Sequence, residues 1–209
     1  MNLQKRDCPI KVKIEPLGSE LLGVSFDFGS RKLTYTPSTA MGDQFGEFVC
    51  ALYTLYHENT NGRFDGHSEW KTREYHTNSN HRIQGTTVTV DWDGEGTYMI
   101  LQMTREIDGN TILLRSSMDY GKTYEEYLVD DRDFCYAVAK ACTETIKQFG
   151  FYGYRYSTES EPIKLHQLLF LKAYALGNMG ARELIVLDEG LDCCKSNFAK
   201  ELELLLFDM

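Results

Sequence analysis

No run of apolar residues in this 209-residue sequence approaches the roughly 20 that a membrane-spanning helix needs. The first seven residues also lack the apolar stretch of a secretion signal. The six cysteines include no C-x-x-C pair, the spacing typical of structural zinc sites and thiol redox motifs. Together these absences predict a cytoplasmic protein with reduced thiols, no cofactor held by cysteine and no membrane partner.

Positive charge is also scarce, because 22 Lys and Arg residues stand against 31 Asp and Glu residues. The formal net charge is -9 and the sequence pI is about 5.1. Such a balance repels phosphate backbones, so nucleic acid is not an expected partner. The same charge attracts a basic protein, since complementary potentials raise association rates.

What the sequence does contain is enough apolar material for a sizeable core, with 42% hydrophobic and 12% aromatic residues. Apolar residues alternate with polar ones over 10–14 and 22–28, which predicts half-buried strands, and a third strand begins at Leu33. Strand patterns return between 69 and 118, with short turns at 93–94 and 108–110. Helical spacing occupies about 43–58 and 131–149, the second segment ending at Gly150.

Strands grouped before helices, without alternating βαβ units, predict the α+β class. We expect an antiparallel sheet of about six to eight strands, packed by two long helices on one face, with a helical C-terminal extension. The expected domains are an α+β domain over 1–160 and a helical extension over 161–209, packed on the same core. The extension reads as three helical pieces, and Leu202, Leu205 and Leu206 share a face of the last one.

A metal site is one candidate, because His67, Glu69, Glu74, His76 and His81 lie close together in the sequence. In an extended strand, His67 shares a face with Glu69, and Glu74 shares a face with His76. The spacing matches no H-E-x-x-H motif, so histidines on a polar loop and edge strand are the preferred interpretation. A metal-assisted hydrolase using segment 67–81 remains the alternative.

Two further patterns favour structure over chemistry. Residues 91–96 imitate the opening of a calcium loop, but Gln102 replaces its last glutamate and the flanks read as strands, so we expect an acidic hairpin turn. Cys135 and Cys142 lie seven residues apart on the second helix among apolar neighbours that raise a thiol pKa, so we expect buried, unreactive thiols.

Aromatic residues supply the candidate binding surface. Segment 151–156 reads as a short aromatic strand whose alternation places three tyrosines on one side. Together with two tryptophans they form the candidate binding set: Trp70, Trp92, Tyr152, Tyr154 and Tyr156. The same tryptophans and tyrosines alternatively line a small-ligand site in a curved sheet.

The favoured hypothesis is a non-catalytic cytoplasmic protein-binding module that needs no cofactor. In its acidity, small size and lack of catalytic motifs, the chain is similar in general character to bacterial immunity proteins, which neutralise basic toxin domains. The hypothesis therefore includes an immunity-type inhibitor of a basic protein. The alternatives are the hydrolase and the small-ligand-binding domain.

Overall fold

The computed structural model of the chain describes residues 7–18, 21–38, 44–56, 71–77, 82–94, 97–107, 110–158, 163–177, 184–188 and 193–209. Within them the fold is α+β with antiparallel sheets, as the sequence predicts. No helix among these residues is long and apolar enough to span a membrane.

The first sheet has three antiparallel strands in the order β1-β2-β3. These strands are β1 (Lys11–Gly18), β2 (Leu21–Asp27) and β3 (Lys32–Tyr35). Leu22, Val24 and Phe26 of β2 are buried and alternate with partly exposed residues. The period of two read from the sequence therefore places one face of this sheet on the core.

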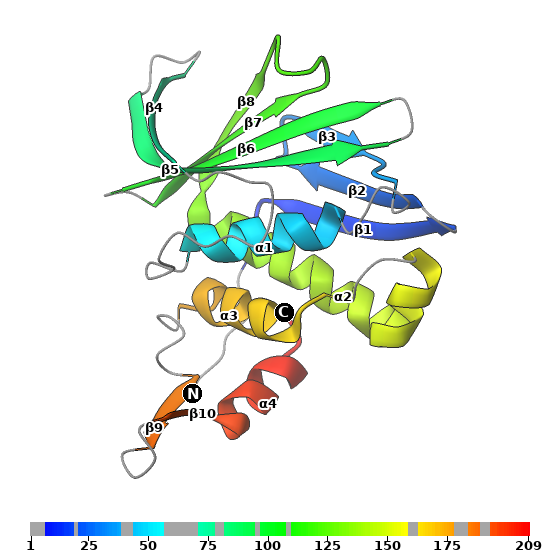
Figure 1. Cartoon of the computed structure of the whole chain (residues 1–209), viewed down its shortest axis with the longest axis vertical. Helices are drawn as coiled ribbons and strands as arrows, with labels where there is room; N and C mark the ends of the chain where they lie inside the picture. Colours follow the sequence, from blue (N-terminus) through cyan, green and yellow to red (C-terminus); the bar gives the residue numbers. More distant parts are fainter. Residues whose placement is uncertain are drawn as a thin grey trace.

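The second sheet is a five-stranded antiparallel meander. Its strands are β4 (Lys71–His76), β5 (Arg82–Asp93), β6 (Tyr98–Glu106), β7 (Thr111–Ser117) and β8 (Glu125–Asp130). The three-stranded and five-stranded sheets together contain eight strands, whereas the sequence predicted about six to eight strands in a single sheet. Figure 1 shows the five-stranded sheet above the helices, with β4 bending away from them.

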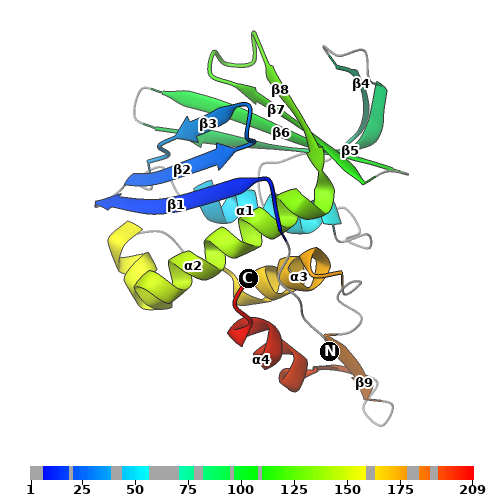
Figure 2. The same ribbon diagram turned by 180° about the vertical axis from the view of Figure 1, so that it is seen from behind.

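Two helices cover the inner side of the sheets. Helix α1 (Gln44–Tyr56) packs on β5, and α2 (Asp131–Thr158) packs on β1, which runs above it in Figure 2. The core between them is aromatic, with the ring of Phe48 5.5 Å from Trp92 and 6.4 Å from Phe134. Both predicted helices are confirmed, including the start of the second at Asp131.

The prediction of a strand over 151–156 is wrong, because these residues continue α2. Gly150 interrupts the helix with φ 68° and ψ 170°, a left-handed φ that glycine adopts without strain, and the helix resumes beyond it. The predicted helix end at Gly150 therefore corresponds to a kink. In a helix, residues two apart do not share a face, so the alternation that grouped Tyr152, Tyr154 and Tyr156 does not apply.

The C-terminal residues that the structure describes form two helices and a hairpin, where the sequence predicted three helical pieces. They comprise α3 (Leu165–Ala175), β9 (Ile185–Asp188), β10 (Cys193–Ser196) and α4 (Phe198–Leu206). Helix α3 packs on α1 and α2, and α4 packs on α3. Helix α4 thus lies farther from the three-stranded and five-stranded sheets than α3 does (Figure 1).

Candidate functional site

The outer face of the five-stranded sheet is the side turned away from α1 and α2. Val88, Val90 and Trp92 of β5 are buried in the core beneath the sheet, so the alternate residues of β5 point outward. The register then places Asp91 beside Ile100, and Asp93 beside Tyr98, on this outer face. It is here that tyrosines and carboxylates come together.

Arg115 of β7 also lies on the outer face, between Gln102 of β6 and Glu126 of β8. Its guanidinium lies 4.7 Å from the centroid of the Tyr75 ring and 4.2 Å from that of Tyr124. Its Nη1 donates a hydrogen bond to Gln102 Oε1 at 3.0 Å, and its Nε lies 3.4 Å from Glu126 Oε1. Two rings, an amide and a carboxylate thus fix a mostly buried cation, so the tyrosines beside it are held in place.

An acid–tyrosine surface, formed by Asp91, Asp93, Tyr98 and Tyr120, lies at one end of this face. Tyr120 is 72% exposed, and its ring stacks on Tyr98 with centroids 4.9 Å apart and planes 10° from parallel. Burial, a hydrogen bond to Asp91 and the nearby Asp93 charge raise the pKa of Tyr98 to about 12. The Tyr98 phenol therefore stays neutral at physiological pH, beside two aspartates.

The β7–β8 loop holds Tyr120 in an uncommon backbone conformation. Tyr120 has φ 59°, and the following Gly121 has φ 79°. The Asp119 carboxylate accepts hydrogen bonds from the Thr123 amide at 2.9 Å and the Thr123 hydroxyl at 2.7 Å. Ser117 Oγ donates to Asp119 at 2.7 Å and accepts from the Gly121 amide at 2.8 Å.

These bonds lower the pKa of Asp119 to about 2, the amide and hydroxyl of Thr123 contributing most. The carboxylate therefore stays ionised at any physiological pH. A left-handed conformation costs an aromatic residue about 1 kcal/mol, and the loop hydrogen bonds offset it. Such strain is typical of positions where function decides the residue.

The residues of the candidate binding set lie elsewhere. Trp92 is fully buried, and its Nε1 donates a hydrogen bond to Gln44 O at 2.9 Å. Its ring lies 5.8 Å from Tyr35 and 6.3 Å from Phe26, so it belongs to the core. Trp70 lies outside the described residues, as do the side chains of Tyr152, Tyr154 and Tyr156.

Two of the five candidate metal ligands are described. Glu74 and His76 share a face of β4, as predicted, with Glu74 Oε1 3.3 Å from His76 Nε2. The other Glu74 oxygen pairs with Arg82 at 2.7 Å, and this hydrogen bond is the main cause of the lowered pKa of Glu74. His67, Glu69 and His81 lie outside the described residues, within which no three ligand-type side chains gather for a metal.

Two structural expectations are confirmed. Cys135 and Cys142 are free and fully buried, and burial raises the pKa of both thiols, that of Cys142 to about 12. The acidic turn is the β5–β6 hairpin, closed by a 2.8 Å hydrogen bond from Gly94 N to Thr97 O. Gly94 is required there, because a Cβ would lie 2.5 Å from Thr36 O.

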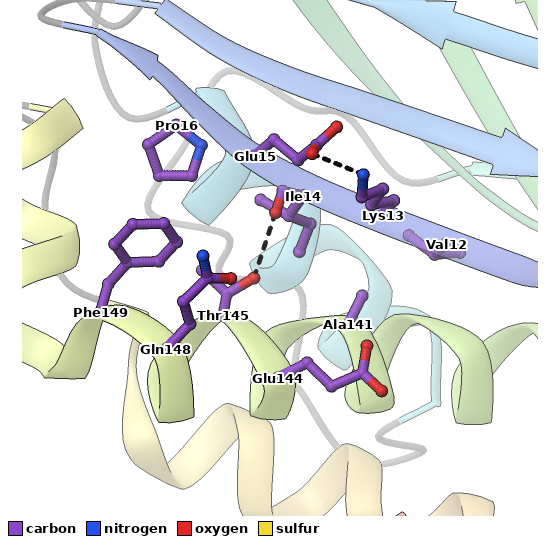
Figure 3. A pocket seen from close by; sticks show the side chains of 10 residues that line it. All are labelled: Val12, Lys13, Ile14, Glu15, Pro16, Ala141, Glu144, Thr145, Gln148 and Phe149. Carbon is purple, nitrogen blue, oxygen red and sulfur yellow. Dashed lines mark hydrogen bonds and ion pairs between the residues drawn. The ribbon is translucent and has the colours of Figure 1, made fainter.

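A groove between the edge strand β1 and helix α2 offers about 550 Å³ of free space, partly open to solvent (Figure 3). The Thr145 hydroxyl donates to Ile14 O across it at 3.5 Å, and Lys13 pairs with Glu15 at 2.5 Å on the strand. A helix side chain thus satisfies the outward carbonyl of the edge. Helix α2 therefore covers part of the exposed edge of β1, and natural sheets commonly have their edges covered by a helix or loop.

A buried polar cluster joins the start of α2 to β6, α1 and α3. Asp131 Oδ2 accepts from Arg105 Nε at 3.1 Å and from the Tyr174 hydroxyl at 2.7 Å. The Tyr56 hydroxyl donates to Asp131 O at 2.7 Å, and its ring lies 4.4 Å from that of Tyr174. Asp131 Oδ1 has no partner among the described residues. The cluster ties four elements together, a structural role for a buried ion pair.

Sequence reasoning missed the acid–tyrosine surface. The signal present was Asp119-Tyr120-Gly121, a turn-type sequence around an aromatic residue. That Tyr120 stacks on Tyr98 depends on the pairing of β6 with β7, which no local pattern gives. Comparison of the chain with protein-family models, curated proteins and solved structures found no match.

Proposed function

We propose that this chain is a non-catalytic cytoplasmic protein-binding module whose acid–tyrosine surface docks a basic partner protein, as an immunity-type inhibitor would. The observation that carries the proposal is Tyr120, an exposed ring kept in a strained backbone conformation and stacked on Tyr98. Rigid tyrosines are favoured interface anchors because they supply contact area at little loss of conformational entropy.

Charge supports the choice of a basic partner. Asp91 and Asp93 flank Tyr98, so an arginine or lysine docked on the stacked rings would meet two carboxylates. The net charge of -9 adds a long-range attraction for the same class of partner. Ring faces and carboxylates together favour a cationic side chain over an acidic or neutral one.

The decisive variant is Tyr120→Asn, because asparagine tolerates the left-handed conformation and removes the ring. A partner captured with the wild-type chain from its native cells is purified, and its affinity is measured by calorimetry. Loss of an anchor ring should weaken binding about 30-fold, the equivalent of about 2 kcal/mol. Leu17→Ala, which truncates a 55% exposed side chain on β1, is the matched control and should bind as the wild type.

Salt dependence tests the charge argument separately. Raising the salt concentration from 50 to about 500 mM should weaken wild-type binding, and Asp91→Asn with Asp93→Asn should reduce that salt dependence. Unchanged affinity of Tyr120→Asn, or a partner whose binding ignores salt, contradicts the proposal.

A further inference from the structure

Helix α4 carries an exposed apolar stripe formed by Phe198, Leu202 and Leu206. Their exposed fractions are 72%, 41% and 71%, and their spacing of four residues keeps them on one side of the helix. The stripe is about 12 Å long at 1.5 Å per residue. Large apolar side chains exposed in a row, rather than singly, mark interaction surfaces.

The opposite side of α4 is firmly attached to the protein. Leu204 is fully buried against Leu169 and Ala173 of α3. The Asn197 side chain caps the first turn by accepting a hydrogen bond from the Lys200 amide at 3.3 Å. With its anchored side turned to α3, the helix presents the stripe outward.

The two residues that follow the last turn are also held. The Lys172 amine donates a hydrogen bond to Phe207 O at 2.9 Å, and Lys147 pairs with Asp208 at 2.6 Å. Both ends of α4 are therefore fixed, and the stripe is a preformed surface. A preformed surface binds without the entropy loss of ordering a flexible segment.

Charges beside the stripe identify the occupant. Each residue advances a helix by about 100°, so Glu201 and Glu203 lie on opposite sides of Leu202, one on each flank of the stripe. Lys200 projects away from it by the same geometry. A second copy of α4 would bring glutamate against glutamate, whereas a helix with lysine or arginine flanks would bring opposite charges together.

We infer that the exposed side of α4 is a docking site for a basic amphipathic helix of a partner protein. The apolar stripe receives the leucine-type face of that helix, and the negative charge of Glu201 beside the stripe favours a basic flank. This surface is separate from the acid–tyrosine surface, since α4 packs on α3, on the far side of α3 from the five-stranded sheet (Figure 1).

Synthetic peptides test the inference on the full chain. One helical peptide carries a leucine stripe with lysine flanks, a second carries the same stripe with glutamate flanks, and a third is a scrambled version of the first. Fluorescence anisotropy should show the lysine-flanked peptide binding at least about tenfold more tightly than either of the others.

The double variant Phe198→Gln with Leu206→Gln removes the ends of the stripe without touching the buried side of α4. It should weaken binding of the lysine-flanked peptide at least about tenfold, while Tyr120→Asn leaves it unchanged. Unfolding midpoints of the variants check that each is folded.

Equal binding of the lysine-flanked and scrambled peptides would overturn the inference, because charge alone would then explain it. Unchanged binding by the double variant would also overturn it. A wild-type dimer in sedimentation equilibrium that the double variant loses would overturn it as well, since a second copy would then cover the stripe.

Discussion

Lys172 of α3 should make the protein more stable as the pH rises above 8. The residue is fully buried, and its pKa falls from 10.5 to about 8, mainly because burial disfavours the charged amine and secondly because Lys147 is near. Asp208 partly opposes the shift. The folded state therefore releases this proton at lower pH than the unfolded state does.

The sign and size follow from proton linkage. Between about pH 8 and 10.5 the unfolded state binds more protons at this residue, so the free energy of unfolding increases with pH. The full shift corresponds to a gain of about 2.5 kcal/mol between pH 7 and 10. The amine also keeps a hydrogen bond to Phe207 O, which favours its charged form, so we expect a smaller gain of about 1 to 2 kcal/mol.

The measurement compares the wild type with Lys172→Met by urea unfolding at pH 7 and pH 10. A comparison is needed because the raised thiol pKa of Cys142 makes stability fall over part of the same range. Methionine fills the site without titrating, so the wild type should gain about 1 to 2 kcal/mol relative to the variant by pH 10. Parallel pH profiles of the two proteins would refute the reasoning.

Three further outcomes are expected. Gly85→Ala should lower the free energy of unfolding, measured in urea, by more than about 2 kcal/mol, because the added Cβ would lie 1.8 Å from Arg105 O. Gly23→Ala is the control and should lower it less, because its Cβ would lie 3.2 Å from the flexible side chain of Leu17. Asp119→Ala should speed hydrogen exchange of the loop amides at 122 and 123 at least about tenfold by NMR, since they lose their acceptor. Cys142 should react with an alkylating reagent at least about 100-fold more slowly than a peptide thiol until the protein unfolds, and rapid native labelling would contradict its burial.

The periodic parts of the fold were predictable because burial on one side leaves a repeating pattern. Leu22, Val24 and Phe26 alternate with partly exposed residues in β2, and the apolar side of α1 follows helical spacing. Each pattern is local and records which side of an element faces the core. Both bounds of α1 and the start of α2 were therefore predicted within a few residues, whereas the end of α2 was not.

Segment 151–156 was mispredicted because aromatic residues favour strands, whereas in the structure the helix resumes beyond the kink at Gly150. The β9–β10 hairpin was missed because it is two strands of four residues each, too short for a clear period. Trp92 was placed in the candidate binding set because a tryptophan suits both an interface and a core. The pairing of β5 with β6 shows that the Trp92 side chain lies in the core.

The energetics of Tyr120 explain why Tyr120→Asn separates binding from folding. The left-handed backbone of a tyrosine costs about 1 kcal/mol, which asparagine largely avoids. The stacked pair with Tyr98 is worth about 0.5 to 1.5 kcal/mol, which asparagine loses. The two terms nearly cancel, so the variant should unfold within about 0.5 kcal/mol of the wild type in urea. A tyrosine that adds almost nothing to stability at a strained position is what the proposed docking role of its exposed ring would require.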